Sequence, residues 1–216
     1  MIKIEGLTRQ FGTFTAVAGI DLTVEKGEVL GFLGPNGAGK STTMKMLTGY
    51  LAPSSGQITV GGFDVVEDPL AAQRLIGYLP EGAPAYADMT PAGFLEFAAQ
   101  VRGLSDGAKA AIDLAVQRTG LQNVLDQPID TLSKGFKRRV GMAQAILHDP
   151  PVLIMDEPTD GLDPNQKHAV RELIRAMAPG KAIVISTHIL EEVEAVCTRA
   201  VIIDKGRIVA DGTPKA

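Results

Sequence analysis

The segment 29–41 reads Val-Leu-Gly-Phe-Leu-Gly-Pro-Asn-Gly-Ala-Gly-Lys-Ser, and it carries the strongest indication of the fold. Its first five residues form an unbroken apolar run, which is typical of a central strand that is buried on both faces of a parallel sheet. The next eight residues match the pattern G-x-x-x-x-G-K-[ST], and the residues from Lys40 to Gly49 have helical spacing. A strand, a glycine-rich loop and a helix in that order predict a phosphate-binding loop.

The residue types in this loop explain how it would hold a nucleoside triphosphate. Gly37 and Gly39 let the backbone curl, so that successive N–H groups converge on phosphate oxygens at the positive end of the following helix. Lys40 adds a positive charge toward the β- and γ-phosphates, and the Ser41 hydroxyl can ligate the Mg²⁺ that bridges them. The residues expected to bind the nucleotide here are Gly34, Pro35, Asn36, Gly37, Ala38, Gly39, Lys40, Ser41 and Thr42.

A second predicted strand, 152–156, is apolar up to its last residue, Asp156, and the adjacent Glu157 adds a second carboxylate. The carboxyl edge of a parallel sheet is where open α/β folds bind their ligands. Because adjacent strand residues point to opposite sides, the two acids are expected to have different roles. We expect Asp156 to hold Mg²⁺ or its water and Glu157 to face the attacking water as a general base or orienting acceptor.

The remaining periodicity predicts an α/β fold with a β-rich opening. Strands are predicted at residues 2–7, 20–24, 29–33, 57–60, 152–156, 182–186 and 200–204, and helices at 91–102, 165–178 and 189–197. Alternation of strand and helix in the last third predicts a parallel sheet with right-handed crossovers. The Ala-rich stretch from Gly82 to Thr131 predicts an inserted helical segment, with Thr90 as a helix N-cap.

Length, charge and cysteine content exclude several classes of protein. At 216 residues the chain is long enough for one domain with its own core. The formal net charge of −4 argues against a protein that chiefly neutralises nucleic-acid phosphates. Cys197 is the only cysteine, which excludes an intrachain disulfide, and the first residues lack a signal-peptide pattern. We expect a cytoplasmic protein that would serve a membrane from outside the bilayer, since no apolar run is long enough to span one.

The order of short segments resembles the nucleotide-binding cassette of the ABC ATPases. These segments are GPNGAGKST, GYLPE, LSKGF, LIMDEPT, GLDP and STH, and they extend over nearly the whole chain. The resemblance implies one domain, 1–216: a P-loop NTPase with a RecA-like parallel core and an N-terminal antiparallel β subdomain in 1–81 and 150–216, and an inserted helical subdomain in 82–149. It also implies ATP as the nucleotide, ATP hydrolysis as the activity, and a head-to-tail dimer. Each ATP would then lie between one subunit's phosphate loop and the other's signature segment.

The signature candidate is Leu132-Ser133-Lys134-Gly135-Phe136. From the residues alone, Ser133 is a plausible helix N-cap, and the helix after it has one apolar face, made by Phe136, Val140, Ala143 and Leu147. The resemblance implies that Ser133 and Gly135 offer hydrogen-bond donors to the γ-phosphate bound by the partner. Lys134 and Phe136 depart from the family's LSGGQ, so any polar contact of the final Gln is lost.

Four further site residues are implied by the resemblance. Glu81 stands where the family most often has a Gln that touches Mg²⁺, and Asp163 lies in the loop that would cross the dimer, although it could equally cap the helix after it. His188 resembles the switch histidine that contacts the γ-phosphate. Phe11 would stack on adenine, with Phe14 as the competing aromatic residue.

The resemblance implies a transporter subunit with a transmembrane partner. The leading expectation is an ATPase that dimerises on ATP, as a homodimer or heterodimer, and drives separate permease subunits of the ABC-2 exporter type at the cytoplasmic face of the membrane. Pro84, Tyr86 and Met89 lie where the family's groove would receive a permease helix. The basic residues 137–139 are expected on a solvated helix face without a nucleic-acid ligand. The alternatives are a soluble ABC-type ATPase acting on ribosomes or DNA, and a small-molecule kinase.

Overall fold

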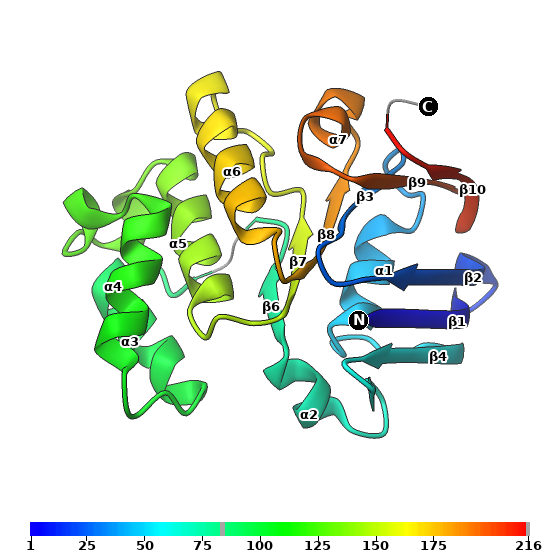
Figure 1. Cartoon of the computed structure of the whole chain (residues 1–216), viewed down its shortest axis with the longest axis horizontal. Helices are drawn as coiled ribbons and strands as arrows, with labels where there is room; N and C mark the ends of the chain where they lie inside the picture. The colour runs from blue at the N-terminus through cyan, green and yellow to red at the C-terminus, as the bar shows by residue number, and fades with distance from the viewer. Residues whose placement is uncertain (83–84, 215–216) are drawn as a thin grey trace.

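The computed structural model describes residues 1–82 and 85–214, and it contains two β-sheets (Figure 1). An antiparallel sheet has the strand order β2-β1-β4-β5, made by β1 (Ile2–Phe11), β2 (Phe14–Val24), β4 (Ser55–Val60) and β5 (Phe63–Asp64). A six-stranded sheet has the order β10-β9-β3-β8-β7-β6, made by β3 (Val29–Leu33), β6 (Ile76–Leu79), β7 (Val152–Asp156), β8 (Ala182–Thr187), β9 (Arg199–Asp204) and β10 (Arg207–Gly212). The predicted α/β class and its β-rich opening are confirmed.

The helices fall into distinct groups around these sheets. They are α1 (Lys40–Leu47), α2 (Pro69–Arg74), α3 (Pro91–Val101), α4 (Ala108–Thr119), α5 (Lys134–Ile146), α6 (Pro164–Met177) and α7 (Leu190–Val196), with two 3₁₀ turns at Gln122–Val124 and Ile129–Thr131. Figure 1 shows α3, α4 and α5 gathered beyond β6, on the side of the molecule away from the antiparallel sheet. Helix α1 contacts β7 and β8 of one sheet and β2 of the other, so it packs between them.

Strand register explains why distant segments meet at one edge of the six-stranded sheet. Strand β8 lies between β3 and β7, and all three run parallel. Leu33, the last residue of β3, pairs with Thr187, and Asp156, the last residue of β7, pairs with Ser186. The loops after the three strands therefore begin side by side.

Several elements differ from the sequence prediction. Strand β10 runs antiparallel to β9 and was not predicted, because its residues are mostly exposed and carry no buried alternation. Helix α2 was also missed, since its six residues are too few for a periodic signal. Strands β1 and β2 extend well beyond 2–7 and 20–24 to meet in a hairpin, where Gly12 has a φ of 58°.

Predicted capping residues are in place at two helices. The Thr90 hydroxyl accepts a hydrogen bond from the Gly93 N–H at the start of α3, and the Ser133 hydroxyl accepts one from the Phe136 N–H at the start of α5. On α5, the predicted apolar face is confirmed, because Val140, Ala143 and Leu147 are buried and Phe136 packs against the same core at its edge.

Two apolar cores stabilise the arrangement. One lies between the sheets around α1, and the other lies between α3 to α5 and the six-stranded sheet. In the second core, α5 approaches β6 so closely that a Cβ atom on Gly77 would clash with the backbone carbonyl oxygen of Ala145. Only glycine permits this approach, because a backbone atom cannot swing aside as the end of a side chain can.

The Gly77→Ala substitution is therefore expected to lower the free energy of unfolding by about 1–3 kcal/mol, the usual effect of overpacking a close contact. Urea denaturation followed by circular dichroism measures the change. Gly212→Ala is the matched control, because Gly212 is also a strand glycine and no atom lies within 4 Å of the position that its new methyl group would take. Equal stability of the two variants would contradict the packing argument.

Within residues 1–82 and 85–214, every helix is too short or too polar to cross a lipid bilayer.

Candidate nucleotide-binding site

The predicted phosphate loop connects β3 to α1, as the motif requires. Gly37 and Gly39 have φ values of 80° and 108°, a region that side chains other than glycine rarely adopt. A Cβ atom on Gly39 would also lie 2.5 Å from the carbonyl oxygen of Ala16. The loop thus depends on these two glycines, and it brings its N–H groups to the N-terminus of α1.

Lys40 lies folded over its own loop. Its side chain is 6% exposed, and Nζ donates hydrogen bonds to the carbonyl oxygens of Gly34 at 2.8 Å and Pro35 at 3.2 Å. The same ammonium lies 3.7 Å from Oε1 of Glu157. The buried charge is therefore satisfied by groups that a phosphate can replace.

A cavity of about 390 Å³ opens over this loop. Its lining includes the predicted residues Phe11, Asn36, Gly37, Gly39, Lys40, Ser41, Thr42, Glu81 and Glu157, together with Phe14 and Ala16. Phe11 and Phe14 are 47% and 61% exposed, so both rings are open to a base. Because both rings line the cavity, its shape does not show which of them would stack on the base. The stacking of Phe11 on adenine stays a prediction.

Asp156 and Ser41 face one another beside this cavity. The Ser41 hydroxyl donates to Oδ1 of Asp156 at 3.3 Å, and the Ser186 hydroxyl donates to the same oxygen. Among the described residues, no cluster of three or more His, Cys, Asp or Glu side chains is placed to hold a metal. A hydroxyl with one carboxylate nevertheless fits Mg²⁺, because this ion typically takes one or two carboxylates and completes its shell with waters and substrate phosphates.

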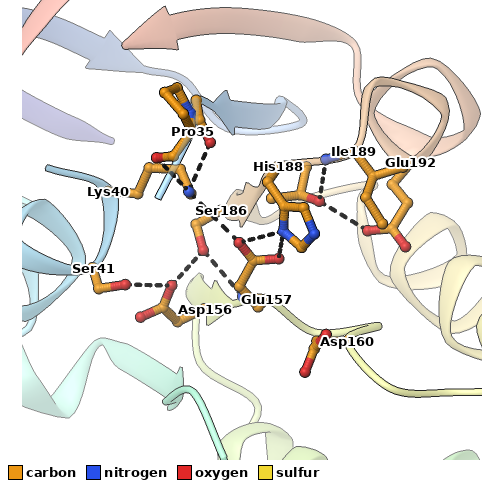
Figure 2. Close-up of polar contacts among 12 residues, drawn as sticks. Pro35, Lys40, Ser41, Asp156, Glu157, Asp160, Ser186, His188, Ile189 and Glu192 are labelled. Carbon is orange, nitrogen blue, oxygen red and sulfur yellow. Dashed lines mark hydrogen bonds and ion pairs between the residues drawn. The ribbon is translucent and has the colours of Figure 1, made fainter. Parts of the chain in front are cut away.

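Glu157 is the centre of the polar cluster in Figure 2. Its φ is 50°, and its N–H donates to the carbonyl oxygen of Ser186 at 3.2 Å and to the Ser186 hydroxyl at 3.0 Å. The Glu157 carboxylate lies between Lys40 and His188. Nδ1 of His188 is 3.1 Å from Oε1 of Glu157 and 3.0 Å from Oε2. The two carboxylate groups thus have different partners: Ser41 and Ser186 contact that of Asp156, and Lys40 and His188 contact that of Glu157.

The segment that carries His188 is fixed by its own hydrogen bonds. The Thr187 hydroxyl donates to Oε2 of Glu192 at 2.9 Å and accepts from the Ile189 N–H at 3.1 Å. Lys167 of α6 donates to Oε1 of Glu192 at 3.0 Å. These contacts connect the histidine segment to α6 and α7.

Ser186 and Glu192 were not identified from the sequence as site residues. Ser186 contacts both acids, and a signal for it existed, since it is a polar residue in the apolar run of β8. Its pairing opposite Asp156 depends on strand order, which periodicity does not supply. Glu192 looks like an ordinary helix-surface acid in the sequence.

The signature segment lies apart from the cavity of its own chain. Residues 133–136 are absent from the cavity lining among the described residues. Lys134 passes over Gly161, and its Nζ lies 3.1 Å from Oδ2 of Asp160, a contact that lowers the pKa of that carboxyl group. Gly135 faces the side chain of Gln166, and a Cβ atom on Gly135 would lie 2.5 Å from that side chain. Thus the signature segment packs beside the start of α6.

Asp163 and Glu81 complete the predicted set. The Asp163 carboxylate caps α6 by accepting from the Gln166 N–H at 3.0 Å, and it remains exposed. Its expected contact with a partner subunit stays a prediction. Glu81 is exposed at the rim of the cavity.

The prediction that residues 137–139 form a solvated helix face is wrong at its centre. Arg138 is buried, with 5% of the residue exposed, whereas Lys137 and Arg139 are partly exposed. The physical reason is that backbone carbonyls gather beneath α5 and provide acceptors for the guanidinium group.

Exposed aromatic side chains lie in the helical part after Glu81. Tyr86 is 58% exposed and makes edge-to-face contacts with Phe94 and Phe97, while Met89 is half-buried. Pro84, named from the sequence for the same groove, lies outside the described residues.

Comparison with known proteins agrees with this geometry. A protein-family model described as "ABC transporter" matches residues 17–160. The chain is 38% identical over 215 residues to the linearmycin resistance ATP-binding protein LnrL of Bacillus subtilis, which covers 99% of this chain and 69% of that protein. It is 39% identical over 217 residues to Nod factor export ATP-binding protein I of Burkholderia lata, covering 100% of this chain and 71% of that protein.

A solved structure has the same fold. It is described as the ATP-binding subunit of an ABC transporter, with a TM-score of 0.90, 32% sequence identity, and coverage of 99% of this chain and 90% of that one. The family match, the two relatives and this structure agree with one another. The chain belongs to the ABC transporter ATP-binding proteins and is an ATPase of that family.

Proposed function

We propose that this chain hydrolyses ATP with Glu157 as the general base and that it does so as part of an exporter. The observation that carries the catalytic assignment is the position of Glu157, whose carboxylate lines the cavity over the phosphate loop next to Lys40 and His188. A carboxylate in that position can accept a proton from a water aimed at the γ-phosphate.

The other polar residues in and beside the cavity have distinct roles in this proposal. The N–H groups of the loop and Lys40 bind the phosphates, with Lys40 exchanging the carbonyls of Gly34 and Pro35 for phosphate oxygens. Ser41 and Asp156 would hold Mg²⁺, which when bound supplies positive charge between the β- and γ-phosphates. His188 orients Glu157 through the contact of its Nδ1 with the carboxylate.

The active unit in this proposal is a head-to-tail dimer. Ser133 and Gly135 stand at the N-terminus of α5, where N–H groups and the helix dipole favour an anion. They do not line the cavity of their own chain, so a γ-phosphate held by a partner is the anion that they would bind. Asp163, exposed at the start of α6, would meet the phosphate loop of that partner.

We further propose that separate transmembrane subunits of an ABC-2 type exporter dock on the helical part of this chain, at the cytoplasmic face of the membrane. The names of the two relatives, one a resistance protein and one an export protein, support an exporter. Tyr86 and Phe97, 58% and 41% exposed, offer apolar surface in the helical part of the chain.

Co-purification from native membranes tests the exporter proposal. A tagged chain, extracted in mild detergent, should bring down a polytopic membrane protein, and the double variant Tyr86→Glu, Phe97→Glu should lose it. The variant Leu114→Glu is the control, because it adds a negative charge at another exposed apolar position, on α4. It should still bring down the membrane protein. Recovery of ribosomes or DNA in place of a membrane protein would favour the ribosome- or DNA-acting alternative and contradict the exporter.

The Glu81→Gln variant is expected to keep its ATPase activity, within about threefold of the unmodified chain. The side-chain carbonyl oxygen of glutamine can still accept from a water or face a metal, so the change removes a charge but leaves an acceptor. Steady-state phosphate release at saturating ATP measures the effect. A folded variant that no longer binds nucleotide would contradict the role given to Glu81.

A further inference from the structure

Arg138 is a buried arginine that hydrogen-bonds to carbonyl oxygens of two separate segments. It projects from α5, five residues after Ser133, with 5% of the residue exposed. Its acceptors are the carbonyl oxygens of Pro158 (3.2 Å from Nε), Pro80 (3.2 Å from Nη1), Asp156 (2.6 Å from Nη2) and Glu157 (from Nη2). Three of the four are consecutive at the end of β7, and the fourth immediately precedes Glu81.

The chemistry of arginine suits this position. A guanidinium group presents five donors in a rigid planar fork, whereas a lysine ammonium is a single point on a flexible stem. Burial lowers the pKa of Arg138, and the negative charges of Asp160, Asp156, Glu157 and Glu81 act against that shift. Without these carbonyls and carboxylates, a guanidinium group would not be stable in such a buried site.

The backbone that Arg138 contacts is strained at the catalytic residue. Glu157 has a φ of 50°, which costs free energy for a residue with a side chain and persists only where the surroundings hold it. On one side the Glu157 N–H is held by Ser186 of β8. On the other side the carbonyl oxygens of residues 156–158 are held by Arg138. The peptide groups around Glu157 are thus fixed from both sides, by β8 and by α5.

We propose that Arg138 is a positioning residue for ATP hydrolysis. Its guanidinium group holds the peptide groups of residues 156–158, and through them it holds the Glu157 carboxylate where it can act on water. Because Arg138 belongs to the helix that begins at the signature segment, the same contacts join Glu157 to the part of the chain that would meet the partner's ATP. The inference rests on the proposed role of Glu157 as the general base.

Two substitutions separate positioning from simple stabilisation. Arg138→Gln is expected to lower kcat by about 10–100-fold, since small displacements of a reacting group have effects of this size, while KM for ATP changes by less than about threefold. Arg138→Lys, which keeps the charge and some donors, is expected to recover part of kcat. The affinity for a fluorescent ATP analogue should stay constant in both.

Arg102→Gln is the matched control. Arg102 is a half-buried arginine that also donates to backbone carbonyls, those of Gln73 at 3.0 Å and Ile76 at 3.3 Å, and it lies outside the cavity. This variant is expected to lower the thermal midpoint of unfolding while kcat of the folded protein stays unchanged. An equal loss of kcat in Arg102→Gln and Arg138→Gln would show that the effect is general destabilisation and would overturn the proposal.

A double-variant measurement completes the test. If Arg138 acts through Glu157, adding Arg138→Gln to Glu157→Gln leaves both the residual single-turnover rate and the ATP-dependent dimer unchanged. A further tenfold loss of rate, or loss of that dimer, would overturn the proposal.

Should Arg138→Gln fail to fold, Arg138→Lys decides the question: reduced kcat with constant KM supports positioning, and unchanged kcat contradicts it. Normal hydrolysis by Glu157→Gln alone would instead overturn the proposed general base, which is a separate result.

Discussion

Glu157→Gln is expected to reduce ATP hydrolysis by at least about 100-fold, the lower end of what a positioned general base contributes. The amide has the size of the carboxylate, so it can occupy the same position between Lys40 and His188. It cannot accept the proton of the attacking water at neutral pH, whereas the phosphate loop and Ser41 remain intact. ATP should therefore still bind, and ATP-bound dimers should accumulate because the step that ends them is blocked.

Phosphate release and gel filtration with ATP and Mg²⁺ measure the two effects. Glu191→Gln is the control, since Glu191 is an exposed acid on α7 outside the cavity. A Glu157→Gln variant that hydrolyses ATP at the rate of the unmodified chain would assign the base to another residue.

Lys40→Ala is expected to weaken ATP binding by about 10–150-fold, the equivalent of one charge-assisted hydrogen bond of about 1.5–3 kcal/mol. The substitution removes the one side-chain ammonium that lines the cavity among the described residues, and it leaves Glu157 without its cation. Electrostatic repulsion between Glu157 and the γ-phosphate would then add to the loss.

Isothermal titration with a non-hydrolysable ATP analogue measures the affinity. Lys45→Ala is the control, because Lys45 lies exposed in the last turn of the same helix and outside the cavity. Equal affinity of Lys40→Ala and the unmodified chain would contradict the proposed phosphate contact.

The sequence predicted the part of the site that local spacing determines. The phosphate loop, the two acids at the end of β7 and the cap of α5 each depend on neighbouring residues, and the structure has all three. Their meeting could be predicted because parallel strands share one carboxyl edge. The family resemblance added the signature segment and His188, which no short-range pattern would single out.

What the sequence could not predict depends on tertiary contacts. Ser186 contacts both acids only because β8 lies beside β7 in the sheet, and strand order is not encoded in periodicity. Arg138 was predicted to be solvated because a run of three basic residues normally lies on an exposed face. Its burial follows from carbonyl acceptors contributed by residues 80 and 156–158, which are 18 or more positions away in the chain.

In the dimer that we propose, each ATP is held between the phosphate loop of one subunit and the signature segment of the other. The test mixes Lys40→Ala with Gly135→Asp at an ATP concentration well below the Kd of Lys40→Ala, where neither variant alone is active. Gly135→Asp places a negative charge where we expect the partner's γ-phosphate to bind. In a mixed dimer one site carries both defects and the other carries neither, so each mixed dimer has one intact site.

We expect an equal mixture to regain up to about one quarter of the unmodified activity, because half of the dimers are mixed and each retains one of its two sites. Each variant alone should stay inactive at the same total protein concentration. A mixture of two folded variants that remains as inactive as its components, although gel filtration shows that mixed dimers form, would contradict a site shared between subunits.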